Sequence, residues 1–235
     1  KETAVTDAEF EAMKGFVHDY LAASVESEDD GGRMRWYPWH SSSYRFNHIL
    51  NVVGLATDLA ESVDADVDVV RVAAVFHDVA KLEADQDVHA EAGARVAREY
   101  LRSHGDYPES FVEAVCSTVV DHSYTGDLAE VPLESRCLIE ADVLDKVGAN
   151  GAVLMLLRMG YESRTHMDAA TMVDRVLRRA HDHTDRVVSD TAESIAHRRI
   201  KRVRRPRAWL SAAGARTLRG APVGRRPPPP PASAR

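Results

Sequence analysis

The dipeptide His-Asp occurs three times in this sequence, at His18-Asp19, His77-Asp78 and His181-Asp182. Imidazole and carboxylate side chains together can bind a divalent metal ion or transfer a proton. The first and third dipeptides lie among polar or charged residues, where we expect solvated side chains. His77-Asp78 instead follows the apolar run 69–76, where ionisable groups are costly to bury unless they are paired or bind a metal. His77 and Asp78 are therefore the centre of a candidate metal site.

Two further segments carry potential ligands within apolar helical patterns. His48 belongs to the same helical stripe as Ile49 and Leu50, and Asp142 follows Ile139 in another apolar segment. Two imidazoles and two carboxylates suit Mn²⁺, Mg²⁺, Co²⁺, Ni²⁺, Fe²⁺ or Zn²⁺, with coordination positions left for water. Open positions favour a catalytic metal over a structural one. A buried His-Asp pair with a purely structural role is the alternative.

Helices must position these side chains, and apolar periodicity indicates where they lie. We expect an amphipathic first helix marked by Phe10, Met13, Val17, Tyr20 and Leu21, and then helices over 44–63, 67–82, 89–103, 109–121, 133–159 and 168–203. The valine-rich segment 67–82 would also suit a strand, but its neighbours all have the length of helices. The predicted fold class is all-α.

Composition narrows the class of protein further. Hydrophobic residues make up 44% of the 235 residues and charged residues 29%, which is typical of a folded domain. No apolar stretch reaches the about 18 residues that a membrane-spanning helix needs. The first eleven residues lack an apolar leader, and only two cysteines occur, Cys116 and Cys137. We therefore expect a cytoplasmic protein with no membrane partner.

Charge divides the chain into two parts. Residues 1–197 carry 18 Lys or Arg and 37 Asp or Glu, a net charge of −19, whereas residues 198–235 carry 12 basic residues and no acidic one. We do not expect the acidic body to bind nucleic acid. Seven of the ten prolines lie in the basic tail, which is expected to be disordered. A tether for nucleic acid or anionic lipid, an inert tail and an out-of-frame extension remain open explanations.

These patterns suggest three regions. An N-terminal helix and an aromatic loop (1–43) pack on the core, a helical catalytic domain spans 44–200, and the basic Pro/Arg-rich tail covers 201–235. The aromatic residues of the loop, Trp36, Tyr37 and Trp39, either cover the core or stack on a base of the substrate. The sequence leaves the oligomeric state open.

The order of the candidate ligands, each on its own helical segment, resembles the HD-domain metal-dependent phosphohydrolase superfamily. Five local strings carry the resemblance, which covers about residues 44–160: Tyr44-Arg45 with His48–Val52, Ala74–Lys81, His89–Ala94, Val119–His122 and Ala141–Gly148. The resemblance implies a helical bundle with His48, His77, Asp78 and Asp142 around one divalent metal at its centre. The Gly-Tyr-Pro signature of members that degrade cyclic dinucleotides is absent, so that substrate is not expected.

Further roles follow from the resemblance and from helical spacing. His89 and His122 fall where two-metal members place additional ligands, although Asp121 stands where such members often have another histidine. With a single metal, His89 and His122 would donate to the substrate phosphate or supply a proton; otherwise they are surface histidines. Lys81, at i+4 from His77, is assigned to phosphate binding. Arg45 either clamps a phosphate or forms a surface ion pair, and Asp145 supports the site or contacts substrate.

The function expected from these residues is hydrolysis of a small phosphorylated substrate, by analogy a nucleotide, by a metal-activated water. Asp78 would ligate the metal and orient the water, with Lys81, His89 and His122 assisting the reaction. One alternative is a non-catalytic HD-like module that binds metal or nucleotide. Another is a nuclease that uses the basic tail to attract its substrate. The sequence does not distinguish a monoester, a diester and an anhydride.

Overall fold

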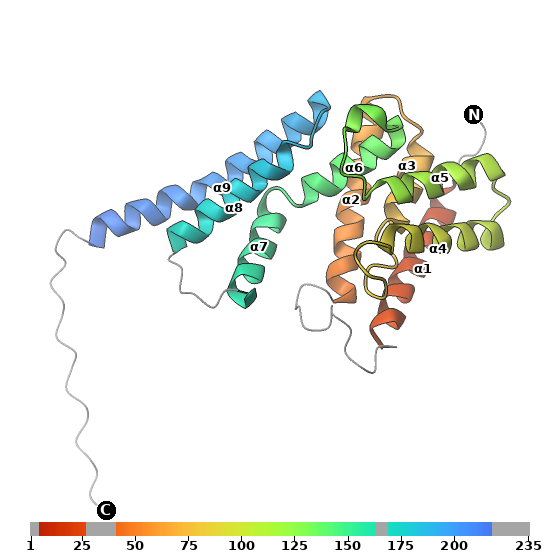
Figure 1. Ribbon diagram of the computed structural model, residues 1–235, viewed down its shortest axis with the longest axis horizontal. Helices are drawn as coiled ribbons and strands as arrows, with labels where there is room; N and C mark the ends of the chain where they lie inside the picture. The colour runs from red at the N-terminus through yellow and green to blue at the C-terminus, as the bar shows by residue number, and fades with distance from the viewer. Residues whose placement is uncertain (1–4, 27–40, 163–168, 218–235) are drawn as a thin grey trace, which may run out of the picture.

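The computed structural model describes residues 5–26, 41–162 and 169–217, and every regular element in these ranges is a helix (Figure 1). The elements are α1 (Asp7–Glu26), α2 (Ser42–Ser62), α3 (Val67–Phe76), α4 (His89–His104), α5 (Glu109–Asp121), the 3₁₀ helix η2 (Leu128–Glu130), α6 (Leu133–Asp145), α7 (Ala149–Glu162), α8 (Ala169–Thr184) and α9 (Asp190–Thr217). The predicted all-α fold class is confirmed. Trp36, Tyr37 and Trp39 lie outside the described residues, so the role of the aromatic loop stays a prediction.

Helix α3 forms the centre of the core. Every residue from Val69 to Phe76 except Arg71 is buried. Asp66 caps the start of the helix by accepting hydrogen bonds from the Asp68 and Val69 amides. Helices α2, α5 and α6 pack around it. A helix that is apolar on nearly all sides is stable only when neighbours cover it, which explains why this valine-rich segment is helical and not a strand.

Helix α3 is shorter than expected, because it ends at Phe76 and not near Leu82. The chain continues in tight turns, in which the Val79 amide bonds the Phe76 carbonyl and the Lys81 amide bonds the Asp78 carbonyl. His77, Asp78 and Lys81 therefore lie on a turn segment and not along one face of a continuous helix. This segment can direct several polar side chains into one space because it does not repeat with a helical period.

Helix α1 is the predicted amphipathic helix. Met13, Val17 and Leu21 have no exposed surface, and the Phe16 ring lies 4.6 Å from the Tyr100 ring and 6.3 Å from the Phe76 ring, measured between centroids. The helix thus covers the core beside α3 and α4. The first His-Asp dipeptide points away from that core, since the side chain of His18 is 58% exposed.

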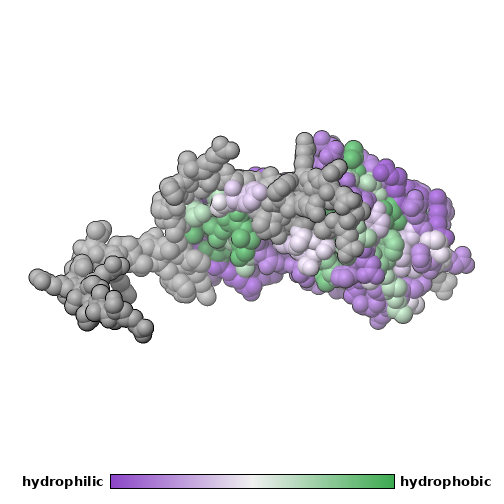
Figure 2. All heavy atoms as spheres, turned by 90° about the horizontal axis from the view of Figure 1, so that it is seen from below, coloured by the Kyte–Doolittle hydropathy of each residue, from purple (hydrophilic) through white to green (hydrophobic). Residues whose placement is uncertain are grey.

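The expected helix over 133–159 is divided into α6 and α7. Gly148 separates them with a φ of +105°, a conformation that favours glycine, and a Cβ at Gly151 would lie 1.8 Å from the Lys146 carbonyl oxygen. This turn directs α7 towards α8 and α9, and the three helices extend to one side of the remaining bundle (Figure 1). Figure 2 shows an apolar patch in the region of α7, where Val153, Leu157 and Tyr161 are exposed.

The expected helix over 168–203 is divided into α8 and α9, and α9 continues over residues 201–217, into the tail that the sequence predicts to be disordered. Arg, Lys and Ala, which are good helix formers, dominate this stretch. Ile200, just before this stretch, is buried against Val147 and Ala180, and Val203 within it is buried against Val176 and Leu177. The predicted boundary at residue 201 therefore lies inside a helix. None of the helices in the described ranges is long and apolar enough to cross a membrane.

Candidate metal centre

Five segments far apart in the sequence deliver side chains to one point in the bundle. Helix α2 supplies Arg45 and His48, the turns after α3 supply His77, Asp78 and Lys81, α4 begins with His89, His122 follows α5, and α6 supplies Asp142 and Asp145. All of these residues are buried, with side chains that would be costly to bury without partners. The reading of His89 and His122 as surface histidines is therefore wrong.

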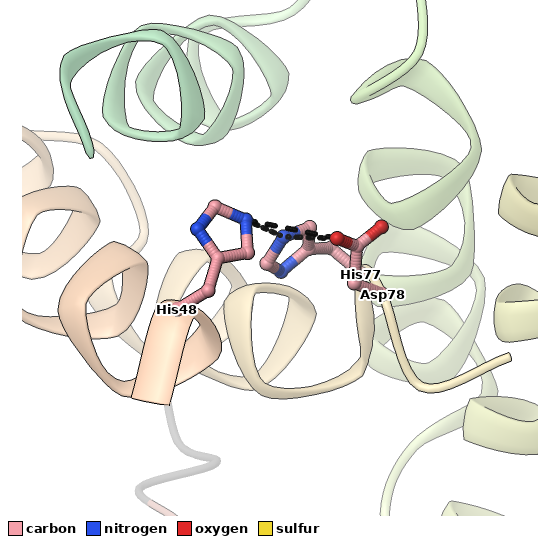
Figure 3. Close-up of side chains that lie close together, drawn as sticks. All are labelled: His48, His77 and Asp78. Carbon is pink, nitrogen blue, oxygen red and sulfur yellow. Dashed lines mark hydrogen bonds and ion pairs between the residues drawn. The ribbon is translucent and has the colours of Figure 1, made fainter. Parts of the chain in front are cut away.

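His48, His77, Asp78 and Asp142 form the first group of this site. His48 Nε2 lies 3.4 Å from His77 Nε2, 3.6 Å from Asp78 Oδ2 and 3.2 Å from Asp142 Oδ1. His77 Nε2 lies 3.7 Å from Asp78 Oδ2. Figure 3 shows the two rings and the Asp78 carboxylate pointing towards one another. The four residues thus offer nitrogen and oxygen ligand atoms around a single space.

Asp78, His89 and His122 form a second group, with Asp78 common to both. Asp78 Oδ1 lies 3.5 Å from His89 Nε2 and 3.7 Å from His122 Nε2, and the two nitrogens are 3.1 Å apart. Lys81 Nζ lies 3.0 Å from His89 Nε2 and 3.9 Å from Asp78 Oδ1. An ammonium group at this position opposes a second cation by charge repulsion.

The hydrogen bonds of the outer ring nitrogens decide which nitrogen of each histidine faces Asp78. Nδ1 of His77, His89 and His122 lies 2.7, 2.6 and 2.5 Å from the carbonyl oxygens of Ala74, Gln86 and Val119. A carbonyl oxygen only accepts, so each Nδ1 carries the proton. His48 Nδ1 likewise donates to Asp145 Oδ2 at 2.7 Å. In the neutral rings the four Nε2 atoms facing Asp78 therefore carry lone pairs, which suits them to bind a metal.

The electrostatics of the site keep Asp78 and Asp142 ionised and His77 neutral. Burial raises the pKa of Asp78, but the neighbouring groups, above all the charge of Arg45, outweigh it and hold the pKa well below its usual range. Burial also raises the pKa of Asp142, but Lys146 and His48 outweigh this effect and hold the pKa well below its usual range. Burial lowers the pKa of His77 to about 3. Ionised carboxylates and neutral imidazoles are the forms that bind metal ions.

His48 is the exception, because two carboxylates lie against its ring. Burial lowers its pKa, but hydrogen bonds to Asp142 and Asp145 raise it more, and the net shift is upwards. A cation bound among the same carboxylates would take the place of the proton on this ring. Asp142 Oδ1 supports that interpretation, because it lies buried 3.2 Å from His48 Nε2 and, without a proton on that nitrogen, has no hydrogen-bond partner among the described residues. The donor set and this buried oxygen fit a divalent cation.

Arg45 and Asp145 lie beside the ligands in positions that the sequence left open. Arg45 Nη1 bonds Asp78 Oδ2 in a buried ion pair, and not in a surface pair. Asp145 contacts His48 from the side away from Asp78. Asp121, which stands where a further histidine was considered, instead accepts a hydrogen bond of 2.6 Å from Ser135 Oγ. Asp121 therefore has a structural partner of its own.

A cavity of about 380 Å³ opens over the site. Its walls include all the ligand candidates of the two groups except His77, together with five basic residues: Arg45, Lys81, Lys146, Arg158 and Arg186. Lys146 Nζ lies 2.5 Å from Asp142 Oδ2, and Arg186 Nη2 donates to the Tyr124 carbonyl at 2.6 Å. A cavity with this many cations, in a body with excess acidic residues, is suited to an anionic ligand.

Sequence reasoning missed three of these basic residues and one acidic residue. Lys146, one helical turn after Asp142, had a local signal in its spacing, whereas Arg158 and Arg186 had none. Glu140 is 1% exposed and accepts hydrogen bonds from the Val188 and Ser189 amides at 2.7 and 2.8 Å. It thereby ties the turn before α9 to the helix that carries Asp142.

Comparisons with known proteins agree with this geometry. A family model described as HD domain matches residues 45–147. The crystal structure of Bacillus subtilis YpgQ in complex with ADP has a TM-score of 0.59 and 19% identity, covering 87% of this chain and 97% of that one. An HD-superfamily hydrolase from Bacillus thuringiensis has a TM-score of 0.60 and 18% identity, covering 91% and 98%. At such identities the likeness concerns the fold.

A tRNA (cytidine(56)-2′-O)-methyltransferase from Thermoplasma volcanium is 32% identical over 62 residues. This match covers 26% of the present chain and 18% of that protein, so it spans less than a fifth of the relative's length. The match to the HD model includes His48, His77-Asp78 and Asp142, which the fold brings together in one buried site. The chain contains an HD domain, which spans residues 45–147.

Proposed function

We propose that this protein is a divalent-metal-dependent phosphohydrolase that acts on a small phosphorylated molecule. The observation that carries the proposal is the convergence of His48, His77 and Asp78, with Asp142 Oδ1 buried 3.2 Å from His48 Nε2. The basic residues of the cavity above it add attraction for phosphate. Ligands with room for water and an anion-binding wall are the two requirements of metal-assisted phosphate hydrolysis.

In this proposal His48, His77, Asp78 and Asp142 would hold one divalent ion. Such an ion, when bound, lowers the pKa of a water towards neutrality and offsets negative charge on phosphate oxygens. We propose one ion because the Lys81 ammonium lies 3.0 Å from His89 Nε2, within the second ligand group. Measured metal content of the purified protein tests this directly, since two ions per chain would contradict it.

The residues around the ligands would bind and orient the substrate. The low pKa of Asp78 makes its carboxylate a weak base, so it orients the attacking water by accepting a hydrogen bond. Lys81 Nζ and the Arg45 guanidinium lie within hydrogen-bonding or ion-pair distance of that carboxylate and can turn donors towards phosphate oxygens. Asp145 keeps His48 in the tautomer whose Nε2 faces the site.

His89 and His122 would handle the proton that the leaving group needs. Each Nδ1 is held by a backbone carbonyl, so proton exchange takes place at Nε2. The two Nε2 atoms are 3.1 Å apart, a distance at which one proton can be shared between them. Burial and Lys81 lower the pKa of His89 to about 4, so a proton that it takes up from the attacking water would pass readily to the leaving oxygen.

We propose a nucleotide as the substrate. A protein with the same fold, Bacillus subtilis YpgQ, was crystallised with ADP, and the cavity of about 380 Å³ over the site is within the range of small-molecule sites. The expected reaction transfers the phosphoryl group of that substrate to water.

A screen with added metals and a matched pair of variants tests the function. Nucleotides and generic phosphate esters are incubated with Mn²⁺, Mg²⁺, Co²⁺, Ni²⁺, Fe²⁺ or Zn²⁺ and with the wild type, Asp78→Ala or Asp19→Ala. Asp19 is the matched control because it belongs to an exposed His-Asp dipeptide. We expect hydrolysis by the wild type and Asp19→Ala, and its loss in Asp78→Ala. Hydrolysis retained by Asp78→Ala would refute the assignment, and nucleotide binding without turnover would favour the non-catalytic module.

A further inference from the structure

A second cavity adjoins the metal centre, enclosed largely by the three C-terminal helices α7, α8 and α9. It has a volume of about 360 Å³ and shares four lining residues with the first cavity: Gln86, Lys146, Leu154 and Arg158. Lys146 is the closest link, because its Nζ lies 2.5 Å from Asp142 Oδ2. A molecule bound at the metal centre can therefore extend past Lys146 into the second cavity.

The walls of the second cavity combine apolar and cationic groups. The apolar side chains are Ala152, Leu154, Met155, Val176, Ala180 and Val203, and the cationic ones are Lys146, Arg158 and Arg179. No acidic residue lines the cavity in the described part of the chain, although acidic residues outnumber basic ones by 37 to 18 over residues 1–197. Such walls are suited to a ligand that carries negative charge next to an apolar or aromatic group.

Most of this cavity lies outside the region that matches the HD family model, which ends at residue 147. Within the model's range only Gln86 and Lys146 contribute. Arg158 comes from α7 and Arg179 from α8, two helices that the tight turn at Gly148 and Gly151 brings beside the site. The part of the chain that follows the common domain is therefore placed to select among phosphorylated substrates.

We propose that the second cavity binds the part of the substrate that does not react, and that the substrate is a nucleoside di- or triphosphate. Lys146, Arg158 and Arg179 bind a second phosphate, because guanidinium groups match phosphate oxygens in charge and geometry. The apolar wall around Met155 receives the nucleoside. This inference rests on the proposed function for the position of the reacting phosphate, but the binding of the remainder is tested separately below.

Kinetics of two neighbouring arginine variants test the proposal. Arg179→Gln removes a charge from the cavity, and Arg178→Gln removes the same charge from the same helix at an exposed position that does not line it. For Arg179→Gln we expect KM for a nucleoside di- or triphosphate to rise about 10-fold, with kcat changed much less, as for a charge-assisted contact to a non-reacting group. The preference for the nucleotide over p-nitrophenyl phosphate, measured as the ratio of their kcat/KM values, should fall to a similar extent. Arg178→Gln should behave as the wild type.

Equilibrium dialysis of the full chain with ADP, in EDTA and without turnover, gives a second readout. Arg179→Gln should weaken ADP binding about 10-fold, and Met155→Trp, which fills part of the apolar wall, should weaken ADP more than tripolyphosphate. Circular dichroism checks whether Met155→Trp is folded. If it is not, Arg179→Gln, which changes an exposed residue, still tests the proposal.

Two outcomes separate this inference from the proposed function. If Arg179→Gln and Arg178→Gln have the same KM and the same affinity for ADP, the second cavity does not bind the substrate, and the inference is wrong while the hydrolase proposal stands. If the wild type hydrolyses no phosphate ester but its ADP binding still depends on Arg179, the hydrolase proposal fails and the assignment of the cavity is supported.

Discussion

Asp145 Oδ2 accepts a hydrogen bond of 2.7 Å from His48 Nδ1, and this contact determines which nitrogen of His48 faces Asp78 and Asp142. The pair joins α2 to α6, two helices that pack against each other along the site. Both side chains are buried, so little water competes for the contact. Asp145 is therefore a positioning residue that prepares a metal ligand.

We predict that Asp145→Asn weakens metal binding about 10-fold to 100-fold, because a neutral amide no longer favours the His48 tautomer with a free Nε2. Calorimetric titration of the protein with Mn²⁺ measures the affinity. Asp182→Asn, at an exposed position on α8, is the control and should bind as the wild type. Equal affinities for the two variants would show that Asp145 does not position His48.

The metal-free protein should lose stability as the pH falls from about 6.5 to 4. Burial lowers the pKa of His89 and of His183 to about 4 and that of His77 to about 3, whereas the ordinary value is 6.5. Over this window the unfolded chain takes up protons that the folded histidines do not bind, so the free energy of unfolding decreases. The raised pKa of His48 opposes the trend, but it is one group against three.

Urea unfolding in EDTA at about pH 7.5 and about pH 5 measures this dependence. His183 is not one of the ligand candidates, and His183→Gln should show a smaller decrease in stability than the wild type. Stability that stays constant or rises towards pH 5 would contradict the assignment of neutral buried histidines. The carboxylates Asp78 and Asp142 lose their contribution only at lower pH, because their folded pKa values lie well below the ordinary 3.8.

Glu140→Ala should lower the free energy of unfolding by about 2–3 kcal/mol. The carboxylate accepts hydrogen bonds from the Val188 and Ser189 amides and from Ser189 Oγ. The substitution removes the acceptor of these three donors just before α9. Urea unfolding measures the change, with the exposed Glu130→Ala as the control. If both variants have the stability of the wild type, Glu140 does not anchor the turn before α9.

Ending the chain at Arg199 should cost about 3 kcal/mol of stability or more, because it removes two side chains that α9 buries. Ile200 is 6% exposed and Val203 is 9% exposed, and both pack on residues of α8. A chain that ends at Thr217 keeps both contacts and is the matched control. Equal urea midpoints for the two shortened chains would mean that α9 beyond Arg199 adds nothing to the fold.

Local sequence was sufficient to predict the helical segments and the principal ligand candidates, but not that 133–159 and 168–203 each form two helices. The apolar period marked α1 and α2, and the contrast between the apolar run 69–76 and the ionisable pair after it singled out His77-Asp78 from two similar dipeptides. The resemblance of the sequence to a known family then joined His48, His77-Asp78 and Asp142 into one set of ligands. Both kinds of signal depend on residue types and on short spacings, which are properties of the linear chain.

Only the tertiary structure decided what surrounds these ligands. Arg158, Arg179 and Arg186 lie on helix faces or turns where an arginine is ordinarily solvated, and no period distinguishes them from their neighbours. The end of α3 at Phe76 and the break at Gly148 depend on how the helices pack, and these two features direct Lys81 and α7 towards the site. Electrostatic contacts between segments a hundred residues apart arise when the chain is folded, so their partners cannot be read from one segment at a time.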